Sequence, residues 1–474
     1  MRVLFPERFP LRRQALTAVM PPFVFCLLVA GLQGCGDDYW WGNGPGATAA
    51  VTTPSGVQTG EVAITYTLTG EVTEADISVA YSTDGKYFHA ATEGSGGDGT
   101  RKLSVSPGGD VHTFTWDSGK DLSAERAPSV MLRIAPQDGM SDTTSAMQVH
   151  NLRFLAAVED PSMSGSAGRV RMYSLDAVEG GIKFLQLVQT GGLDPYDILH
   201  DHGFFFVANE TSNTISVFKL DETQKTIVAV GGSPFSAGAA KAKYLATDGS
   251  HLFVSGLGNT VSVLERDSQT GALNFRSSVS VDGCRGLATR SGHLYVAGET
   301  TGGISIFDVQ PGGELLLNGY SPVTTGGLVS PRSLVVAGAR IYAVNSTQAG
   351  ICGFNILGGG SLSPVSGSPF VASGIASEQL ASSSSKLLAP NGAGDRLLSF
   401  SVDPFGTVTE DSFSPLTLPG PSFSAMAAGN VVVAATTTAE RLEIWTVDAT
   451  GVLTPGASSP FEAGVGVIRM AVSD

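Results

Sequence analysis

The sequence predicts an all-β protein in which a seven-bladed β-propeller follows a β-sandwich. A pair of short strands recurs seven times after residue 152, at spacings of roughly 42 to 51 residues, and this is the period of propeller blades. Glycine is abundant, with 60 residues in 474, and no stretch of the repeat region keeps helical spacing. A unit of four short strands cannot bury both of its faces alone, whereas seven units packed in a ring can.

The chain begins with the pattern of an export signal. Basic residues precede an apolar segment at residues 23–32, which is too short to span a bilayer. Residues 32–35 then read Leu-Gln-Gly-Cys, which resembles the lipobox of bacterial lipoproteins. The order of these regions predicts a signal peptide at residues 1–34 and a lipid on Cys35. The alternative is an ordinary cleaved signal with an incidental cysteine.

A tether and a first folded domain are expected next. Residues 35–50 are rich in Gly, Asp and aromatic side chains and are typical of a flexible linker. Residues 51–152 alternate apolar and polar positions, with a hairpin turn at Asp84-Gly85, and predict a β-sandwich with Tyr66 and Trp116 in its core. Strands are expected at residues 62–68, 77–81, 111–116 and 130–134. The order of these segments resembles fibronectin type III or immunoglobulin-like modules of bacterial exported proteins, which implies a spacer or adhesion role.

Residues 153–474 carry the repeat. Each unit contains a short apolar strand, an alternating strand, a third strand and then an inner strand, and in five units a Ser-Pro pair precedes the inner strand. Because proline ends ladder pairing, the Ser-Pro pair indicates an architectural kink. The Ser-Pro motifs lie at residues 233–235, 321–323, 368–370, 414–416 and 459–461. The inner strands are expected at residues 195–199, 242–246, 284–288, 331–335, 378–381, 423–427 and 467–472.

The order of the strands predicts how the ring closes. The blade that begins at Phe154 lacks an inner strand before it, and the chain ends with an unmatched inner strand at residues 466–473. We therefore expect this C-terminal strand to become the innermost strand of the first blade, which removes both open edges of the ring.

The repeat resembles the lactonase-type seven-bladed propeller family. The resemblance rests on residues 206–209, 213–218 and 231–235 and extends over residues 153–474. The family includes 6-phosphogluconolactonase-like enzymes and exported repeat proteins of unknown activity. Its enzymes commonly carry a histidine in a Pro-x-His pattern on an inner strand, whereas residues 194–199 here read Asp-Pro-Tyr-Asp-Ile-Leu. The resemblance therefore implies the fold more strongly than the activity.

The histidines that do occur recur at one position of the repeat. His200, His202, His251 and His293 fall at the turn after an inner strand, at the end opposite to that of the Pro-x-His pattern. Recurrence at one turn favours a turn-capping role over a catalytic one. No Gly-x-Ser-x-Gly motif, phosphate-binding loop or acidic metal loop is present in the sequence.

The charge and the cysteine content of the chain exclude several classes of binding partner and cofactor. The chain has 28 Lys and Arg against 43 Asp and Glu, a net charge of −15, and it lacks a basic stripe, which argues against nucleic-acid binding. Four cysteines without zinc-type spacing predict neither a metal site nor a disulfide framework, and Cys284 and Cys352 are expected to be small buried residues. We expect no cofactor, a monomer, and membrane association through the anchor alone.

One set of polar residues forms a candidate site at a mouth of the propeller channel. Three neighbouring inner strands begin with a cation, and the strands on either side begin with Glu378 and Tyr196. The ends of adjacent strands add Asn209 and the acidic Glu210 and Glu299. The three cations are Lys243, Arg285 and Arg332. Such an arc could bind a carboxylate or a lactone oxygen through charge-assisted hydrogen bonds. Alternatively, the cations pair with the nearby carboxylates and are structural.

Two classes of function remain open at this point. The first is a non-catalytic envelope lipoprotein that displays the propeller as a binding module for a protein, a glycan or a small anionic ligand. The second is a periplasmic hydrolase of small anionic lactones at the channel mouth. The sequence favours the first class, because the Pro-x-His histidine is missing and no general base is obvious.

Overall fold

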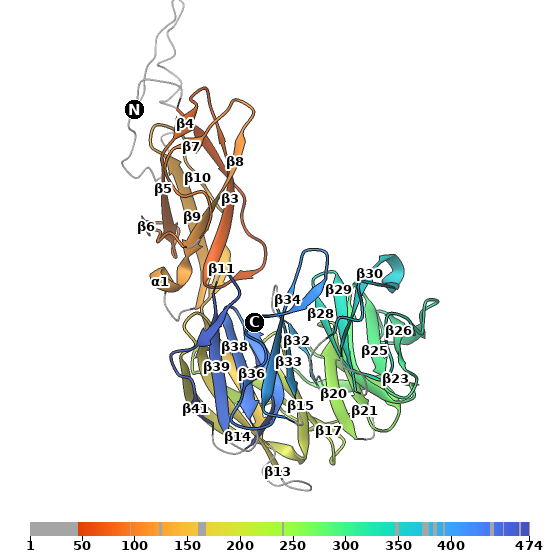
Figure 1. Cartoon of the computed structure of the whole chain (residues 1–474). Coiled ribbons are helices and arrows are strands. Elements are labelled where there is room, and N and C mark those ends of the chain that lie inside the picture. Colours follow the sequence, from red (N-terminus) through yellow and green to blue (C-terminus); the bar gives the residue numbers. More distant parts are fainter. Residues whose placement is uncertain are drawn as a thin grey trace, which may run out of the picture. The chain divides into compact units, whose positions relative to one another are not determined.

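The computed structural model describes residues 46–474 except 95, 123–125, 160–166, 239–240, 347–349, 372–378, 383–385, 392–393, 437–439, 449, 464–465 and 474. The predicted signal peptide, Cys35 and Glu378 lie outside these residues. The described residues form a β-sandwich and a seven-bladed β-propeller, which confirms the predicted fold class (Figure 1).

The sandwich consists of two principal sheets. One sheet has the order β1–β3–β8, and the other has the order β2–β11–β9–β5–β6. Strand β3 alternates buried and exposed residues along its length, so that one face packs into the core. Tyr66 and Trp116 are fully buried, as expected. The strands are β1 (Thr48–Val51), β2 (Val57–Gln58), β3 (Glu61–Thr69), β5 (Ile77–Ser82), β6 (His89–Ala90), β8 (Asp110–Asp117), β9 (Arg126–Pro136) and β11 (Met147–His150). Short elements complete this domain: β4 (Glu74–Ala75), β7 (Leu103–Ser104), β10 (Asp142–Thr143) and the helix α1 (Ser118–Leu122).

Each propeller blade is an antiparallel sheet whose strands follow chain order from the centre of the ring outwards. Blades two to four contain β15 (Pro195–Asp201) to β18 (Thr226–Ala229) with β19 (Phe235–Ser236), β20 (Ala242–Thr247) to β23 (Leu273–Ser280), and β24 (Cys284–Arg290) to β27 (Leu315–Leu317). Blades five to seven contain β28 (Pro331–Ala337) to β31 (Leu362–Pro364), β32 (Ala381–Ser382) to β35 (Val408–Glu410) with β36 (Leu416–Thr417), and β37 (Ser422–Ala428) to β40 (Leu453–Pro455) with β41 (Phe461–Glu462). The second and third strands of these blades are β16 (Phe204–Asn209) and β17 (Thr214–Asp221), β21 (His251–Gly256) and β22 (Thr260–Arg266), β25 (His293–Gly298) and β26 (Gly303–Val309), β29 (Arg340–Asn345) and β30 (Ile351–Ile356), β33 (Lys386–Asn391) and β34 (Arg396–Val402), and β38 (Val431–Thr436) and β39 (Arg441–Val447).

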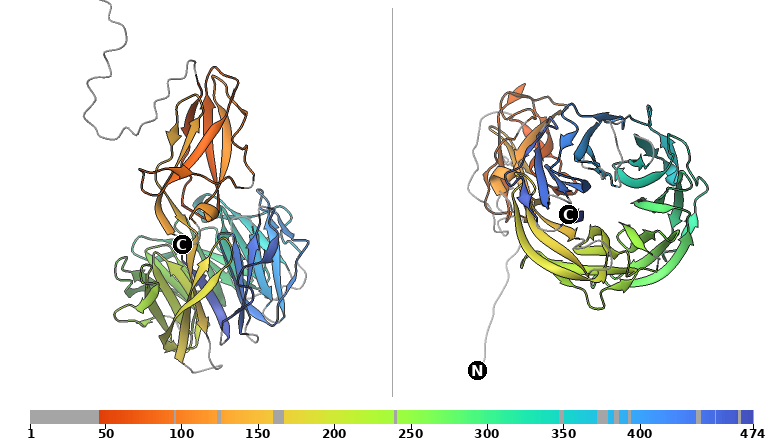
Figure 2. Two further views of the ribbon diagram at one scale, coloured as in Figure 1. Left: turned by 90° about the vertical axis from the view of Figure 1, so that its left-hand side faces the viewer. Right: turned by 60° about the horizontal axis from the view of Figure 1, so that its bottom comes forward.

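The first blade is completed by the C-terminus, as the sequence predicts. Its sheet has the order β14 (Ile182–Leu193), β13 (Ala167–Asp176), β12 (Leu152–Glu159) and β42 (Val467–Val472). Strand β42 pairs antiparallel with β12, and Ala156 lies opposite Ala471. The right-hand view of Figure 2 shows the strands arranged as a ring around a centre, with the last strand beside the first.

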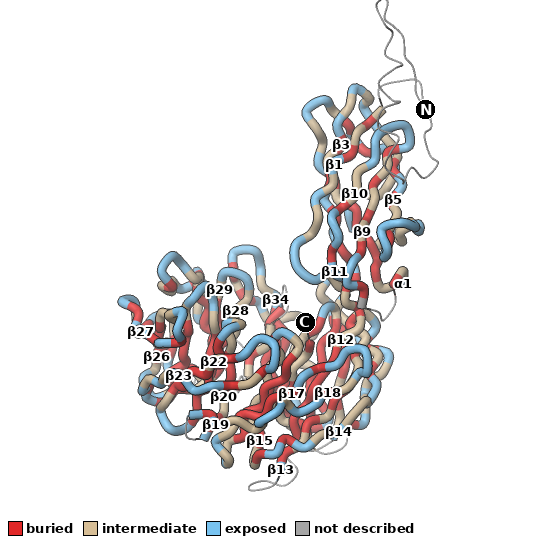
Figure 3. Tube along the Cα trace, turned by 180° about the vertical axis from the view of Figure 1, so that it is seen from behind, coloured by how far each residue is buried: buried red, intermediate tan, exposed pale blue. Residues whose placement is uncertain are grey.

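The core of the propeller lies between blades. One cluster of buried apolar side chains fills each interface between neighbouring blades, including the interface between the seventh and the first, where Ile444 and Val433 pack with Leu155 and Tyr173. The buried residues accordingly follow the inner and middle strands of the blades (Figure 3). This arrangement explains the repeat, because each blade needs two neighbours to bury its faces.

The five Ser-Pro motifs have one structural role in common. In each of them, the serine hydroxyl oxygen accepts a hydrogen bond from a backbone N–H of the third strand of its own blade. The donors are Val217, Ile306, Gly353, Ser399 and Ile444, and the acceptors are Ser233, Ser321, Ser368, Ser414 and Ser459. The side chain thus satisfies a strand N–H at the point where ladder pairing stops.

Candidate functional site

A repeated irregularity of the inner strands builds the central channel. Strands β15, β20, β28 and β37 each shift register against the next strand at their second residue, and β42 shifts at the corresponding point. A bulge of this kind leaves one residue unpaired and re-aims its side chain. It allows two consecutive residues to contribute to the channel, whereas a regular strand would turn alternate side chains to opposite faces.

The bulges create two sets of channel residues, which we call the mouth ring and the inner ring. The mouth ring comprises the second residues of the inner strands, of which Tyr196, Lys243, Arg285, Arg332, Phe423 and Ile468 are described. The inner ring comprises the third residues, Asp197, Tyr244, Gly286, Ser333, Ser424 and Arg469, together with Gln379, which precedes β32 at the corresponding point of the repeat. All inner-ring residues except Ser424 line one cavity of about 180 Å³.

The predicted cations meet at the mouth ring and are paired there. Arg285 Nη2 lies 2.6 Å from Glu299 Oε2, and Arg332 Nε bonds the other oxygen of the same carboxylate. Burial alone would raise the pKa of Glu299, but the hydrogen bond and charge of Arg332, together with Arg285, lower it. Glu299 therefore bridges two blades as a carboxylate held between two guanidinium groups.

The third predicted cation lies against an aromatic ring. Lys243 Nζ lies 4.0 Å from the centre of the Tyr196 ring and 3.4 Å from Glu210 Oε2. The guanidinium carbon of Arg469 lies 4.8 Å from the centre of the same ring. Tyr196 thus makes cation–π contacts with Lys243 of the mouth ring and Arg469 of the inner ring, and it links the two rings.

Two predicted site residues do not join this group. Asn209 is fully buried inside its blade, where its amide nitrogen donates to Ser216 Oγ at 2.8 Å and to Thr214. The expectation that its side chain reaches the channel mouth is therefore wrong, because strand β16 ends with this residue facing its own sheet. Glu378 lies outside the described residues, so its placement stays a prediction.

None of the inner-ring residues was predicted as a site residue from the sequence, and Asp197 and Arg469 are the charged ones among them. Asp197 accepts hydrogen bonds from the backbone N–H of Ile198 and of Leu245 in the next blade, both at 3.0 Å. Desolvation raises the pKa of Asp197 to about 6, although the positive charge of Arg469 opposes the shift. Asp197 occupies the position at which the Pro-x-His pattern has its histidine. The sequence therefore did contain an indication of this residue, namely an ionisable side chain in place of that histidine.

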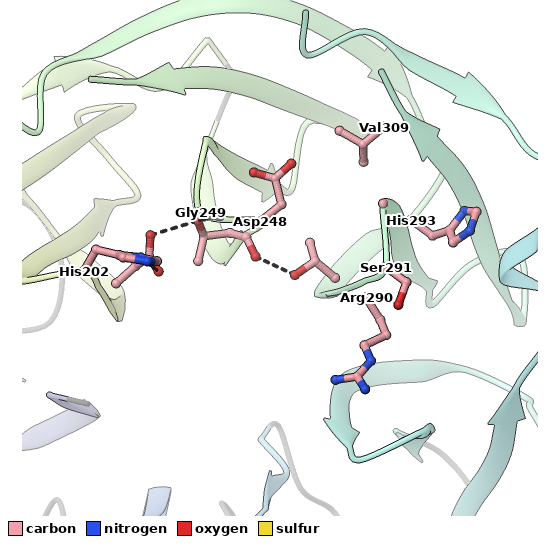
Figure 4. A pocket seen from close by; sticks show the side chains of 11 residues that line it. His202, Asp248, Gly249, Arg290, Ser291, His293 and Val309 are labelled. Carbon is pink, nitrogen blue, oxygen red and sulfur yellow. Dashed lines mark hydrogen bonds and ion pairs between the residues drawn. The ribbon is translucent and has the colours of Figure 1, made fainter. Parts of the chain in front are cut away.

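A larger cavity of about 460 Å³ lies at the opposite ends of the inner strands (Figure 4). Figure 4 shows His202 and His293 at opposite sides of it, and neither points toward the other. The histidines of these turns bond carboxylates: His202 Nδ1 lies 2.7 Å from Asp201, His251 Nδ1 3.0 Å from Asp248, and His293 Nδ1 2.8 Å from Asp308. This pairing agrees with the turn-capping role expected from their recurrence.

Within the described ranges, no group of three or more His, Cys, Asp or Glu side chains is placed to hold a metal ion. The same part of the chain contains no helix that is long and apolar enough to cross a membrane.

The chain resembles known propellers in sequence and in structure. A family model described as "Lactonase, 7-bladed beta-propeller" matches residues 201–326. The matched residues lie within the propeller. Three similar solved structures are a putative 6-phosphogluconolactonase from Bacteroides fragilis (18% identity, TM-score 0.56, covering 68% of this chain and 98% of that one), another from Bacteroides uniformis (14%, 0.58, 68% and 100%) and a periplasmic gluconolactonase from Pseudomonas aeruginosa (17%, 0.53, 67% and 98%). No curated protein matches the chain.

These identities are low, so the structural neighbours establish the fold of the lactonase-like propeller and not its chemistry. The chemistry must be argued from the residues of the channel.

Proposed function

We propose that this protein is exported, is anchored to the bacterial envelope through a lipid on Cys35, and binds a small anionic ligand at the mouth of the propeller channel. The sandwich would then act as a spacer between the anchor and the binding module. The proposal for the anchor rests on the order of basic, apolar and Leu-Gln-Gly-Cys segments at the N-terminus.

The excess of positive charge at the channel carries the binding proposal. The described mouth and inner rings hold four cations, Lys243, Arg285, Arg332 and Arg469. The acidic groups placed against them are Glu210, Glu299 and Asp197. The whole chain has a net charge of −15, so the channel is a local positive region in an acidic protein. A recess lined by one sign of charge focuses the field and attracts a ligand of the opposite sign.

A variant that removes the cations together with their carboxylate partner tests the proposed binding site at the channel mouth. Replacing Arg285 and Arg332 with Gln leaves Glu299 without its partners, and breaking a buried pair in this way costs about 3–5 kcal/mol, with less expected here because Glu299 keeps some exposure. The triple variant R285Q/R332Q/E299Q removes the unpaired carboxylate as well. We expect the triple variant to melt close to the wild type and to bind gluconate at least tenfold more weakly in calorimetry. Unchanged affinity of the triple variant would place the binding site elsewhere.

Hydrolysis of a lactone is the second candidate, and Asp197 is the observation that favours it. A carboxylate with a pKa of about 6 can accept a proton from water near neutral pH. The resulting hydroxide would attack the lactone carbonyl, and the arginines would stabilise the oxyanion. The ring C–O bond would then break, and the leaving oxygen would take the proton back from Asp197 to give the hydroxy acid. The similar gluconolactonase and putative 6-phosphogluconolactonases lead us to test glucono-lactone and 6-phosphoglucono-lactone.

A pH-stat assay separates the two candidates. A hydrolase should release one acid equivalent per lactone, and D197N should slow that release by at least tenfold. A binding module should retain gluconate affinity and leave lactone decay at its spontaneous rate in both proteins.

A further inference from the structure

Arg469 is a buried cation whose hydrogen-bond partners among the described residues are neutral. It lies on the closing strand β42, and only 3% of its surface is exposed. Its Nη1 donates to the carbonyl oxygens of Phe423 at 2.8 Å and of Ile468 at 2.9 Å, and its Nη2 donates to the Tyr196 hydroxyl at 3.3 Å. No carboxylate of the described residues forms a salt bridge with it. A guanidinium group has five N–H donors, so donors remain for a further acceptor.

Burying a cation without a counter-charge is costly, and such groups usually pair with an anion. Asp197 lines the same cavity, and its carboxylate oxygens accept hydrogen bonds from the backbone N–H groups of Ile198 and Leu245. The charge of Arg469 acts on this carboxylate and opposes the rise of its pKa, but no carboxylate of the described residues forms an ion pair with the guanidinium group, so its remaining N–H donors are available to an anionic ligand.

The remaining walls of the cavity offer hydrogen-bonding groups. Ser333 Oγ accepts the N–H of Leu380 at 2.9 Å, so its own hydrogen is available to donate to a ligand. Tyr244 and Gln379 line the cavity as well and add a phenol and an amide group to its wall. At Gly286, a Cβ atom would come within 2.7 Å of the Arg332 carbonyl oxygen, so glycine at this position allows the inner strands of two neighbouring blades to approach closely.

We propose that the inner ring binds a compact hydroxy acid, with Arg469 as the counter-cation of its carboxylate, Ser333 as a donor to that carboxylate and Asp197 as the acceptor of a hydrogen bond from a hydroxyl group of the ligand. The proposal rests on the proposed binding of an anion at the mouth and specifies where the carboxylate of the ligand lies. A cavity of about 180 Å³ corresponds to roughly six waters at about 30 Å³ each, which fits an acid of a few carbon atoms and excludes a polymer.

Calorimetry on the full chain, purified in detergent, tests the site with D-glycerate as the probe and glycerol as its neutral analogue. We expect R469Q to weaken glycerate binding at least tenfold and S333A to weaken it several-fold. We expect no binding of glycerol. The matched control is R276Q, which removes an arginine of the outer strand β23 that pairs with Glu265 and lies far from the channel axis. This control should bind glycerate as the wild type does.

The outcomes also separate this inference from the proposed mouth site. If glycerate does not bind the wild type, or if R469Q binds it unchanged, the inner-ring site is wrong. If R469Q no longer melts cooperatively, S333A decides, because it removes only a hydroxyl group, and unchanged binding by S333A would overturn the proposal. Loss of gluconate binding in R285Q/R332Q/E299Q together with unchanged glycerate binding in R469Q would leave the mouth function standing without the inner site.

Discussion

Asp197 has the most unusual setting among the carboxylates of the channel. Two backbone N–H groups from adjacent blades hold it in place, while desolvation raises its pKa to about 6. The charged groups and polar walls that face it are Arg469 from β42, Tyr244 from β20 and Ser333 from β28. The carboxylate is therefore largely protonated in a mildly acidic medium and charged above neutrality.

This shift predicts how the protein's stability depends on pH. The folded state holds the Asp197 proton up to about pH 6, whereas the unfolded chain releases it near the ordinary value of 3.8. Stability should therefore fall as pH rises from about 4 to 6, because the folded state binds more protons over that range. At about 1.4 kcal/mol per pKa unit, the shift from 3.8 to about 6 contributes on the order of 3 kcal/mol.

The variant D197N isolates this contribution. Asparagine keeps an acceptor for the two N–H groups but carries no charge, so we expect D197N to melt above the wild type at pH 8 and to match it at pH 4. Thermal melts at both pH values provide the measurement. An equal difference between the two proteins at pH 4 and pH 8 would show that Asp197 does not titrate in this range.

The sequence allowed part of this chemistry to be predicted. The repeat located Lys243, Arg285 and Arg332 on equivalent positions, and these residues do meet at the mouth ring. It did not indicate Asp197 or Arg469, because an unbroken strand places neighbouring residues on opposite faces. The bulge that brings Asp197 and Arg469 to the channel depends on how the inner strand pairs with its neighbour. No residue type in the inner strands predicts this bulge.

At the scale of elements, the strand order was predictable and the strand ends were not. Hydrophobic alternation and the Ser-Pro motifs fixed the period, since each motif recurs where a strand N–H needs a side-chain acceptor. Strand β16 illustrates the limit. Its apolar run ends in Asn209, which is compatible with an exposed turn, yet the neighbouring strand buries this amide through Ser216 and Thr214. Such tertiary burial cannot be read from local pattern alone.

Closure of the ring by β42 gives an element-scale prediction. Removal of residues 467–474 exposes the β12 edge and deletes the buried Val467 and Met470 from the interface between the last and first blades. Burial of each such side chain contributes about 1.5–3 kcal/mol, and the strand ladder adds to it. With about 2–4 °C per kcal/mol in larger domains, we expect the melting temperature to fall by on the order of 10 °C or more.

Calorimetric melting of the truncated and full chains checks this expectation, and removal of Asp474 alone provides the control, because it leaves β42 intact. A truncated protein that melts with the full-length chain would show that the first blade is stable without its inner strand.

At the scale of the whole molecule, charge is distributed unequally. The chain is strongly acidic, with a net charge of −15, while the channel gathers cations from four blades. An acidic surface gains nothing from anionic lipid, so the membrane association proposed here depends on covalent lipid. The acidic surface also repels anions from the outside of the protein. The channel is therefore the favourable place for an anionic ligand.

The proposed anchor gives the last prediction. Each buried CH₂ of a lipid chain contributes about 0.8 kcal/mol to membrane binding, and two or more chains together hold a protein stably. C35A removes the acceptor of that lipid, so the variant should move from the detergent phase to the aqueous phase or remain unprocessed with a larger mass. C26A is the matched control, because Cys26 lies within the apolar segment of the signal and its loss should leave processing and detergent partitioning unchanged. Equal detergent partitioning of C35A and the wild type, with normal processing, would exclude Cys35 as the anchor and favour an ordinary cleaved signal.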